Sequence, residues 1–426
     1  ISAIQIFNFH PYVLAFCPDS TDVYEITDKS SPPRHITSLT PPSKGTFRSG
    51  TIFLRPGAVI VDPSRDAIII VENRLHVWNL HSGQEQRTID LFGTVSEFPI
   101  IYDKGRVLVT LTDEAEEEGE ERTDFWILAC NPFGLEPTDY DFITQIRIPA
   151  PERHEVYNHV LYSREHGVVV GQHISLTSQP LKLHYWSPKR QPDDESQPPT
   201  HTISLPMTLD GARSMLAQYA VSIDDHRFVL STLETVLGSP DVPGSSQTVI
   251  RAHVLPSLET IWEADPIPGQ AHAIYHLPKQ GVTIAFGKAN ESIDDDDPVH
   301  ATWIVVVDVE HGKRLQFTKL NHREIEKKIF FCSLTTSVTE EGEIVPSDEP
   351  EIVFVSGQGE VATLPIARYL KEGLTAGQFG ALEKTIQSSD FRLDEDYVSL
   401  LSNQVSIGQL SVAAMGGDNL LSLFTW

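Results

Sequence analysis

The stretch that decides the fold is AIIIVENRLHVWNLHSGQ, residues 67–84. An apolar run, a short turn and a second apolar run ending in Trp78 and Asn79 together predict an antiparallel β-hairpin. The same order recurs far along the chain, in GVTIAF at residues 281–286 and IVVVDVEHGK at residues 304–313. Both hairpins end with two apolar residues, Asn or Asp, one apolar residue, two polar residues and a glycine. One further strand follows each of them, which indicates a repeated unit.

This unit resembles the WD40 repeat family. In that family the second and third strands of each unit form a hairpin, the third strand ends near a Trp-Asp pair, and a turn leads to the outer strand. Trp78-Asn79 and Val307-Asp308 stand at that position here, so neither unit carries the strict Trp-Asp pair. The resemblance implies a β-propeller, which is built from repeated four-stranded sheets called blades.

The hairpin pattern extends over the whole chain, and helical periodicity is nearly absent. Eight hairpins favour eight blades, whereas merging one weak unit gives seven. We therefore expect a seven- or eight-bladed WD40-like β-propeller of four-stranded antiparallel blades, forming a single domain over residues 1–426. The last hairpin lacks an outer strand, which the run at residues 3–9 would supply. The hairpins are expected at residues 12–27, 67–80, 106–131, 167–186, 227–255, 281–309, 351–364 and 410–426.

Two further features fit this architecture. Residues 366–385 predict a short helical insertion between blades, which is either a simple connection or a docking element. Tryptophans recur on or beside the third and outer strands, so we expect them to pack between blades rather than to form a ligand cage. They are Trp78, Trp126, Trp186, Trp262 and Trp303.

Composition excludes several classes of partner. The net charge is -27, from 59 acidic and 32 basic side chains, and such a field repels phosphate backbones and anionic membrane surfaces. No stretch approaches the roughly 18 apolar residues that span a bilayer. Cys17, Cys130 and Cys332 lie in apolar, strand-like runs, so we expect reduced, buried thiols and a cytoplasmic or nuclear protein. The chain begins at Ile1, and a segment preceding it is expected to have been removed.

Acidic runs supply the candidate binding residues. Insertions near residues 113–122, 234–247, 291–298 and 339–350 lie between the second and third strands of their proposed blades, or close to them. We expect these loops to gather on one rim and to meet a basic partner by electrostatic steering, the alternative being solvated insertions without a partner. The candidate partner-binding residues are Asp113, Glu116, Glu117, Glu118, Asp294, Asp295, Asp296, Asp297, Glu340 and Glu341.

Catalytic chemistry finds little support in the sequence. No Gly-x-Ser-x-Gly motif, phosphate-cradling glycine loop or calcium-loop spacing is present, and we expect no cofactor. Histidines at 154 and 159, and at 272 and 276, stand on or near proposed innermost strands. We expect ordinary polar histidines at strand ends, the alternative being that they converge on a metal in the central channel. The alternative function is therefore a metal-dependent, lactonase-like hydrolase.

The leading interpretation is a non-catalytic protein-interaction propeller, either a scaffold subunit or a substrate receptor. The phrases at residues 68–83 and 420–426 also resemble the propeller half of fungal F-box proteins. That resemblance implies substrate recognition for ubiquitin ligation, with the F-box preceding Ile1.

Overall fold

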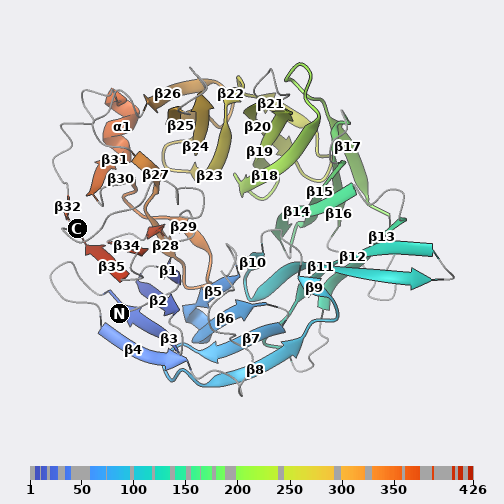
Figure 1. Cartoon of the computed structure of the whole chain (residues 1–426), viewed down its shortest axis with the longest axis vertical. Helices are drawn as coiled ribbons and strands as arrows, with labels where there is room; N and C mark the ends of the chain where they lie inside the picture. Colours follow the sequence, from blue (N-terminus) through green and yellow to red (C-terminus); the bar gives the residue numbers. More distant parts are fainter. Residues whose placement is uncertain are drawn as a thin grey trace. The chain divides into compact units, whose positions relative to one another are not determined.

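In the computed structural model the described residues are all-β apart from one short α-helix and one 3-10 turn (Figure 1). No helix among the described residues is long and apolar enough to cross a membrane. The residues that the structure describes are 5–9, 11–16, 20–26, 34–39, 58–72, 74–95, 100–117, 120–134, 140–149, 155–163, 165–174, 179–187, 198–237, 244–291, 299–321, 329–356, 360–374, 386–387, 405–407, 411–415 and 421–425.

Seven sheets formed by the described strands contain a path of four antiparallel strands, which is the blade of a propeller. The prediction of a propeller with four-stranded antiparallel blades is confirmed, with seven such blades. The chain divides into two compact units, one of residues 1–90 with 320–426 and the other of residues 91–319.

The first unit holds three blades, a hairpin, a three-stranded sheet and the helix. Its first two blades are β1 (Gln5–Phe9), β2 (Tyr12–Phe16), β3 (Thr21–Glu25) and β4 (Arg34–Leu39), then β5 (Val59–Asp62), β6 (Ala67–Val71), β7 (Arg74–Asn79) and β8 (Glu85–Asp90), with the 3-10 turn η1 (Pro63–Arg65) between β5 and β6. Its third blade is β27 (Ile329–Leu334), β30 (Glu351–Ser356), β31 (Glu360–Pro365) and β32 (Ile386–Gln387). The other elements are β28 (Thr336–Val338), β29 (Ile344–Pro346), α1 (Ile366–Glu372), β33 (Val405–Ile407), β34 (Ser411–Met415) and β35 (Leu421–Thr425).

The second unit holds four blades that follow one another in sequence. They are β10 (Ile101–Asp103), β11 (Arg106–Glu117), β12 (Glu120–Cys130) and β13 (Tyr140–Pro149); β14 (Glu155–Ser163), β15 (Gly167–Ile174), β16 (Leu181–Trp186) and β17 (His201–Leu205); β18 (Ser214–Ser222), β19 (Arg227–Val236), β20 (Ser245–Val254) and β21 (Thr260–Glu263); and β23 (Gln270–Leu277), β24 (Val282–Glu291), β25 (Val299–Asp308) and β26 (Arg314–Asn321). Two short strands extend these sheets, β9 (Thr94–Val95) beside β11 and β22 (Ile267–Pro268) beside β20.

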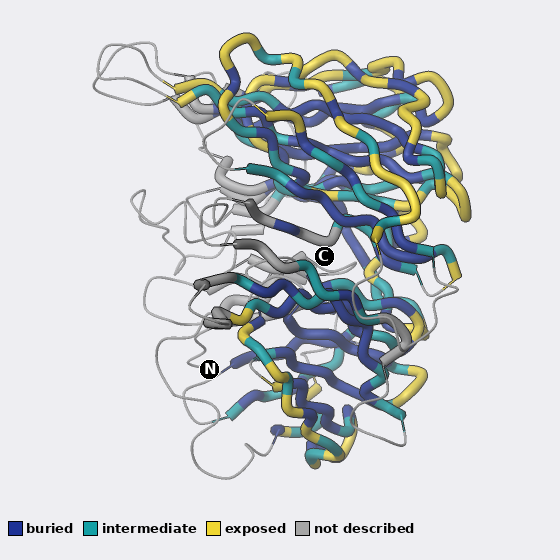
Figure 2. The backbone as a smooth tube through the Cα atoms, turned by 90° about the vertical axis from the view of Figure 1, so that its right-hand side faces the viewer, coloured by how far each residue is buried: buried dark blue, intermediate teal, exposed yellow. Residues whose placement is uncertain are grey.

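Burial follows strand position within each blade. Every residue of β2 and β6 is buried, because a middle strand is covered on both faces by neighbouring sheets. The outer strand β8 instead alternates between exposed and covered positions. Figure 2 shows the same contrast, with buried strand centres and exposed turns. The uniformly apolar runs at residues 12–16 and 67–71 are therefore the second strands of blades.

The hairpins at residues 67–80 and 281–309 end in the same turn. Asn79 N donates to Gln84 O at 2.9 Å and Gly83 N to Asn79 O at 3.0 Å, while Asp308 N donates to Lys313 O and Gly312 N to Asp308 O at 2.9 and 3.0 Å. Gly83 and Gly312 have φ of 65° and 69°, which glycine adopts without steric cost. These two equivalent hydrogen bonds confirm the sequence alignment of the two repeats at this turn.

Packing between blades is confirmed for three of the five tryptophans, Trp186, Trp262 and Trp303. Trp262, on the outer strand β21, donates its indole N–H to the backbone oxygen of Val309 in the next blade at 2.8 Å. A Cβ placed on Gly312 would lie 2.7 Å from this indole ring, so the glycine permits the close approach. Trp262 and Trp303 belong to one buried cluster. Trp186 belongs to another, which spans its own blade and the preceding blade.

The N-terminal run does not complete the last sheet. β1 pairs antiparallel with β2, from Gln5 opposite Phe16 to Phe9 opposite Tyr12, and forms the innermost strand of the first blade. Pairing two strands that are close in sequence costs little loop entropy, and the buried β2 needs partners on both edges. The prediction that residues 3–9 supply the last outer strand is therefore wrong. The last hairpin is present as β34 and β35, within the three-stranded sheet β33–β35.

The helical insertion is confirmed in its first half. Residues 366–372 form α1, whose Ile366 and Tyr369 are buried and whose Gly373 ends the helix with a φ of 69°. Residues 375–385 lie outside the described part of the chain.

Candidate functional site

The acidic run near residues 113–122 is a long β-hairpin rather than a loop. β11 and β12 stay paired from Val107 opposite Cys130 to Glu117 opposite Glu120, and the pairing of β12 with β13 begins only at Arg122. The far end of the hairpin is therefore two-stranded, and Figure 1 shows it projecting from its own unit. We call residues 113–121 the acidic hairpin.

Acidic residues occupy opposed positions in the register of the acidic hairpin. The register places Asp113 opposite Asp124, Glu116 opposite Glu121 and Glu117 opposite Glu120. Directly opposed like charges destabilise an antiparallel pair by roughly 0.2–1 kcal/mol each. Asp113 is exposed, whereas Asp124 is 4% exposed and accepts a hydrogen bond from Gln145 Nε2 at 2.9 Å. Glu118 lies outside the described residues.

A second acidic run has a comparable position. β24 and β25 pair as far as Glu291 opposite Val299, so residues 292–298 connect the second and third strands of their blade. Asp294, Asp295, Asp296 and Asp297 lie outside the described residues, and their placement on a binding surface stays a prediction.

The acidic run at residues 339–350 occupies a different connection from the other two. It lies between β27 and β30, the innermost and second strands of its blade. In an antiparallel sheet that connection is at the opposite end from the connection between the second and third strands. The expectation that it lies between or close to the second and third strands is therefore wrong for this run. Glu340 and Glu341 are both exposed at the tip of the β28–β29 hairpin.

The two ends of the segment 234–247 are paired β-strands rather than a polar loop. Glu234 lies in β19 and Gln247 in β20, where they are cross-strand partners. The Glu234 side chain is 0% exposed, and its carboxylate accepts backbone N–H bonds from Thr208 at 2.9 Å and from Leu209 at 2.7 Å. Gln247 Nε2 donates to the same carboxylate at 3.0 Å. Residues 238–243 lie outside the described part.

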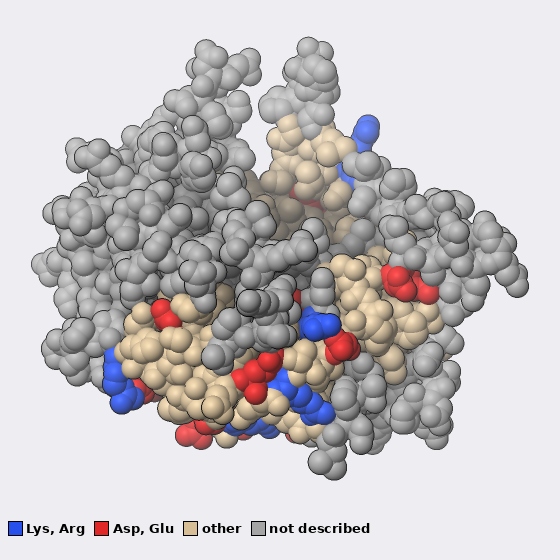
Figure 3. All heavy atoms as spheres, turned by 60° about the horizontal axis from the view of Figure 1, so that its bottom comes forward, with Lys and Arg blue, Asp and Glu red and all other residues tan. Residues whose placement is uncertain are grey.

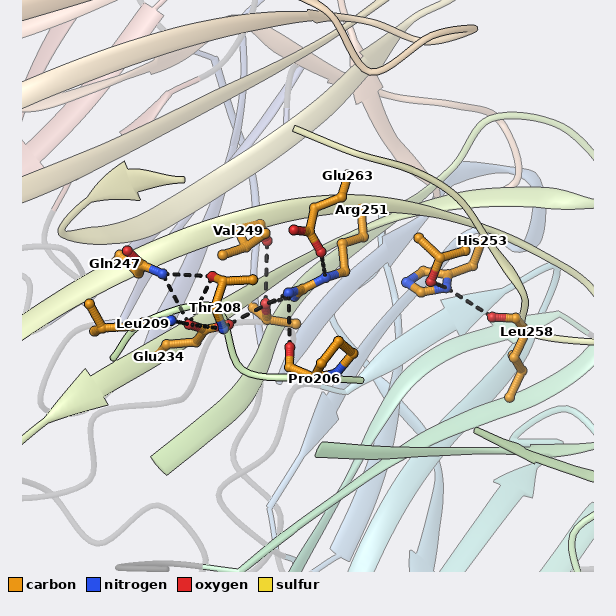
Figure 4. A network of polar contacts seen from close by, with 12 residues as sticks. Pro206, Thr208, Leu209, Glu234, Gln247, Val249, Arg251, His253, Leu258 and Glu263 are labelled. Atoms are coloured by element: carbon orange, nitrogen blue, oxygen red, sulfur yellow. Dashed lines mark hydrogen bonds and ion pairs between the residues drawn. The ribbon is translucent and has the colours of Figure 1, made fainter. Parts of the chain in front are cut away.

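Arg251 completes this buried network (Figure 4). Its guanidinium, 1% exposed, lies 3.5 Å from Glu234 Oε1 and donates to Glu263 Oε2 and to Thr232 Oγ1, each at 2.6 Å. It also donates to Pro206 O at 3.2 Å. The network fastens the link between β17 and β18 onto the following blade. Sequence reasoning missed it, although a lone arginine inside the apolar run Val249–Val254 signals a buried charge that must be paired.

Basic and acidic side chains are interspersed on the outer strands of the first unit. Arg34 pairs with Glu25, and Arg74 Nε lies 2.7 Å from Asp90 Oδ1. Figure 3 shows this mixture where described residues reach the surface. Exposed pairs of this kind contribute little binding or stability. Concentrated negative charge is instead a property of the acidic insertions.

The structure describes the candidate metal-binding histidines only in part. His276 Nδ1 donates to Val282 O at 3.2 Å, and burial lowers the pKa of His276. His159 is placed only by the pairing of β14 with β15, and residue 154 is outside the described part. Among the described residues, no group of three or more His, Cys, Asp or Glu side chains could hold a metal ion.

Neither a family model nor a curated protein matches this chain. Solved structures similar to it include BamB from Moraxella catarrhalis, with 10% identity, a TM-score of 0.48, and coverage of 99% of this chain and 96% of that one. The β-propeller domain of Cps50 (Swd1) from Myceliophteria thermophila has 8% identity, a TM-score of 0.44 and coverage of 100% and 97%. The C-terminal WD40 domain of Sif2 has 10% identity, a TM-score of 0.37 and coverage of 100% and 98%. Because these three TM-scores are below 0.5, the likenesses assign no function to the chain. Any functional proposal must be argued from the residues of the chain itself.

Proposed function

We propose that this chain is a non-catalytic protein-interaction propeller whose acidic hairpin binds a basic protein partner. The observation that carries the proposal is the register of β11 and β12, which sets three pairs of carboxylate residues opposite each other. A two-stranded hairpin bearing opposed like charges is poorly stabilised by itself. Lysine and arginine side chains of a partner would relieve that repulsion, and the field of the hairpin would steer them to it.

The proposal covers two roles, a scaffold subunit and a substrate receptor of a ubiquitin ligase. The proteins that co-purify with the chain distinguish them, because a receptor would bring a ligase adaptor with it. A cytoplasmic or nuclear location is part of the same proposal. Cys130 supports it, since it is a free thiol that is buried in the described structure.

The test compares two variants that each lose three negative charges. The first carries Asp113→Asn, Glu116→Gln and Glu117→Gln in the acidic hairpin. The control carries Asp210→Asn, Asp225→Asn and Glu259→Gln, three exposed positions in the same unit. At low salt we expect the hairpin variant to associate with the native partner about tenfold more slowly than wild type, and the control to match wild type. Equal association rates for all three proteins would rule the proposal out.

A further inference from the structure

One blade contains an insertion that its sheet does not require. In the other described blades the innermost and second strands are joined by two to four residues, as between β10 and β11 or between β18 and β19. Residues 335–350 make the same connection between β27 and β30 and form the two-stranded sheet β28–β29. Connections of this length in compact domains are usually functional. We call residues 335–350 the strap hairpin.

The base of the strap hairpin is fixed by hydrogen bonds. Thr335 Oγ1 and Ser347 Oγ are 2.8 Å apart, and both residues are buried. Glu351 N donates to Thr335 Oγ1 at 2.9 Å, and Ser347 N donates to Thr335 O at 3.0 Å. The two strands therefore leave the blade in a defined direction, which lowers the entropy lost when a partner binds.

The tip of the strap hairpin is held by a different blade. Ser64 N, in the turn between β5 and β6, donates to the backbone oxygen of Glu340 at 2.8 Å. Arg65, next to Ser64 in the same turn, lies 2.6 Å from Asp62. The hairpin is thus anchored at both ends while the side chains of its tip remain exposed.

One face of the strap hairpin carries apolar side chains that are partly exposed. Val338 lies directly opposite Ile344, and Pro346 follows two residues later on the same face. Ile344 is 57% exposed, while Val338 and Pro346 are partly exposed. Among the described residues, β28 and β29 pair only with each other. β28 also contacts β1 of the first blade, so the strap hairpin is held against its own unit while the Ile344 side chain stays exposed.

The charges around Ile344 indicate which kind of partner would bind there. Glu340 and Glu341 are exposed at the tip, and Asp348 and Glu349 are exposed where the chain returns to β30. We propose that the strap hairpin docks a short protein segment in which lysines or arginines flank one aliphatic side chain, with that side chain packed on Ile344. This rests on the proposed interaction function and adds a second binding surface, distinct from the acidic hairpin.

The test uses the full chain and a fluorescein-labelled synthetic peptide in which lysines flank a central leucine. Binding is measured by fluorescence anisotropy for wild type, for Ile344→Ser and for Ile261→Ser. Ile261 is the matched control, because it is an isoleucine on an outer strand with 42% exposure. A peptide with glycine in place of the leucine tests the apolar contact from the other side. Ile344→Thr, which keeps a β-branched residue in the strand, is included in case Ile344→Ser impairs folding.

We expect Ile344→Ser and Ile344→Thr to weaken peptide binding about tenfold, with Ile261→Ser equal to wild type. The glycine peptide should bind wild type as weakly as the leucine peptide binds Ile344→Ser. The inference is overturned if wild type does not bind the leucine peptide, or if Ile344→Ser binds it unchanged. Either result leaves the acidic hairpin untouched, because that surface is tested with the native partner and with different substitutions.

Discussion

Asn79 and Asp308 make the same side-chain hydrogen bond in two different blades. Asn79 Oδ1 accepts from the backbone N–H of His81 at 3.2 Å, and Asp308 Oδ1 accepts from that of Glu310 at 2.8 Å. Asn131 repeats the bond with Phe133 N at 3.1 Å. Asn79 and Asp308 end third strands and Asn131 directly follows one, so each side chain caps the turn that leads to the outer strand.

The fold should tolerate Asp308→Asn better than Asp308→Ala. Asp308→Asn keeps the acceptor oxygen that Asn79 and Asn131 use, so the free energy of unfolding should change little. Asp308→Ala leaves the N–H of Glu310 without this bond and should cost about 1 kcal/mol. Urea denaturation of the two variants checks this, and an equal loss for both would show that the cap is not what the side chain contributes.

Gly312→Ala should be more damaging than Gly281→Ala. Both glycines have positive φ, 69° and 65°, so each substitution carries about 1 kcal/mol of backbone strain. Only at Gly312 would the added Cβ also meet the Trp262 ring, at 2.7 Å, whereas nothing lies within 4 Å at Gly281. The difference between the two unfolding midpoints measures the inter-blade contact. Equal midpoints would contradict it.

Glu234→Ala should destabilise the chain far more than Glu263→Ala. Glu234 is fully buried and caps the backbone of Thr208 and Leu209, so its loss leaves a buried guanidinium and two N–H groups underpaired. The expected cost is about 3–5 kcal/mol. Glu263 is 36% exposed and lies 2.6 Å from the same arginine. Glu263→Ala should therefore lower the free energy of unfolding by about 1 kcal/mol or less. Chemical denaturation of both variants tests the ranking, and a reversed order would refute it.

Acidification should destabilise the chain partly through His253. Burial lowers the pKa of His253 to about 4, from about 6.5 in an unfolded chain. The unfolded state therefore binds the proton first, so this stability is fully present above pH ~6.5 and is lost as the pH falls toward ~4. The total loss is at most about 3 kcal/mol.

His253→Gln isolates that effect. The wild-type stability minus that of His253→Gln should fall between pH ~6.5 and ~4, because the shifted group is present in only one of the two proteins. His311→Gln is the control, since the His311 side chain is 79% exposed. A pH-independent difference between wild type and His253→Gln would show that this histidine does not couple folding to protonation.

The blades were predictable because their second strands are continuous apolar runs bounded by turns. The pattern of residues 67–84 identified β6, β7 and the glycine turn after them, and the same pattern located β24 and β25. Such a pattern reports which strands are neighbours along the chain. It does not report which edge of a sheet a separate strand joins, so residues 3–9 were assigned to the wrong blade.

The candidate site was less predictable, because polar residues have two opposite uses. Glu234 and Asp113 look alike in a sequence, yet one is a buried carboxylate with several donors and the other is exposed on the acidic hairpin. Only the cross-strand partners separate the two cases, and those depend on register. The strap hairpin was recognised as an acidic run. Its apolar face was not, because Val338 and Ile344 become neighbours only once β28 and β29 pair.

Affinity purification of the protein from its native cell, followed by mass spectrometry of co-purifying proteins and of bound metal, tests the interaction function most directly. A stoichiometric basic protein partner that dissociates as salt is raised, with no metal bound, is the result predicted here. A solitary protein that carries one tightly bound metal would contradict it and would favour a metal-dependent hydrolase.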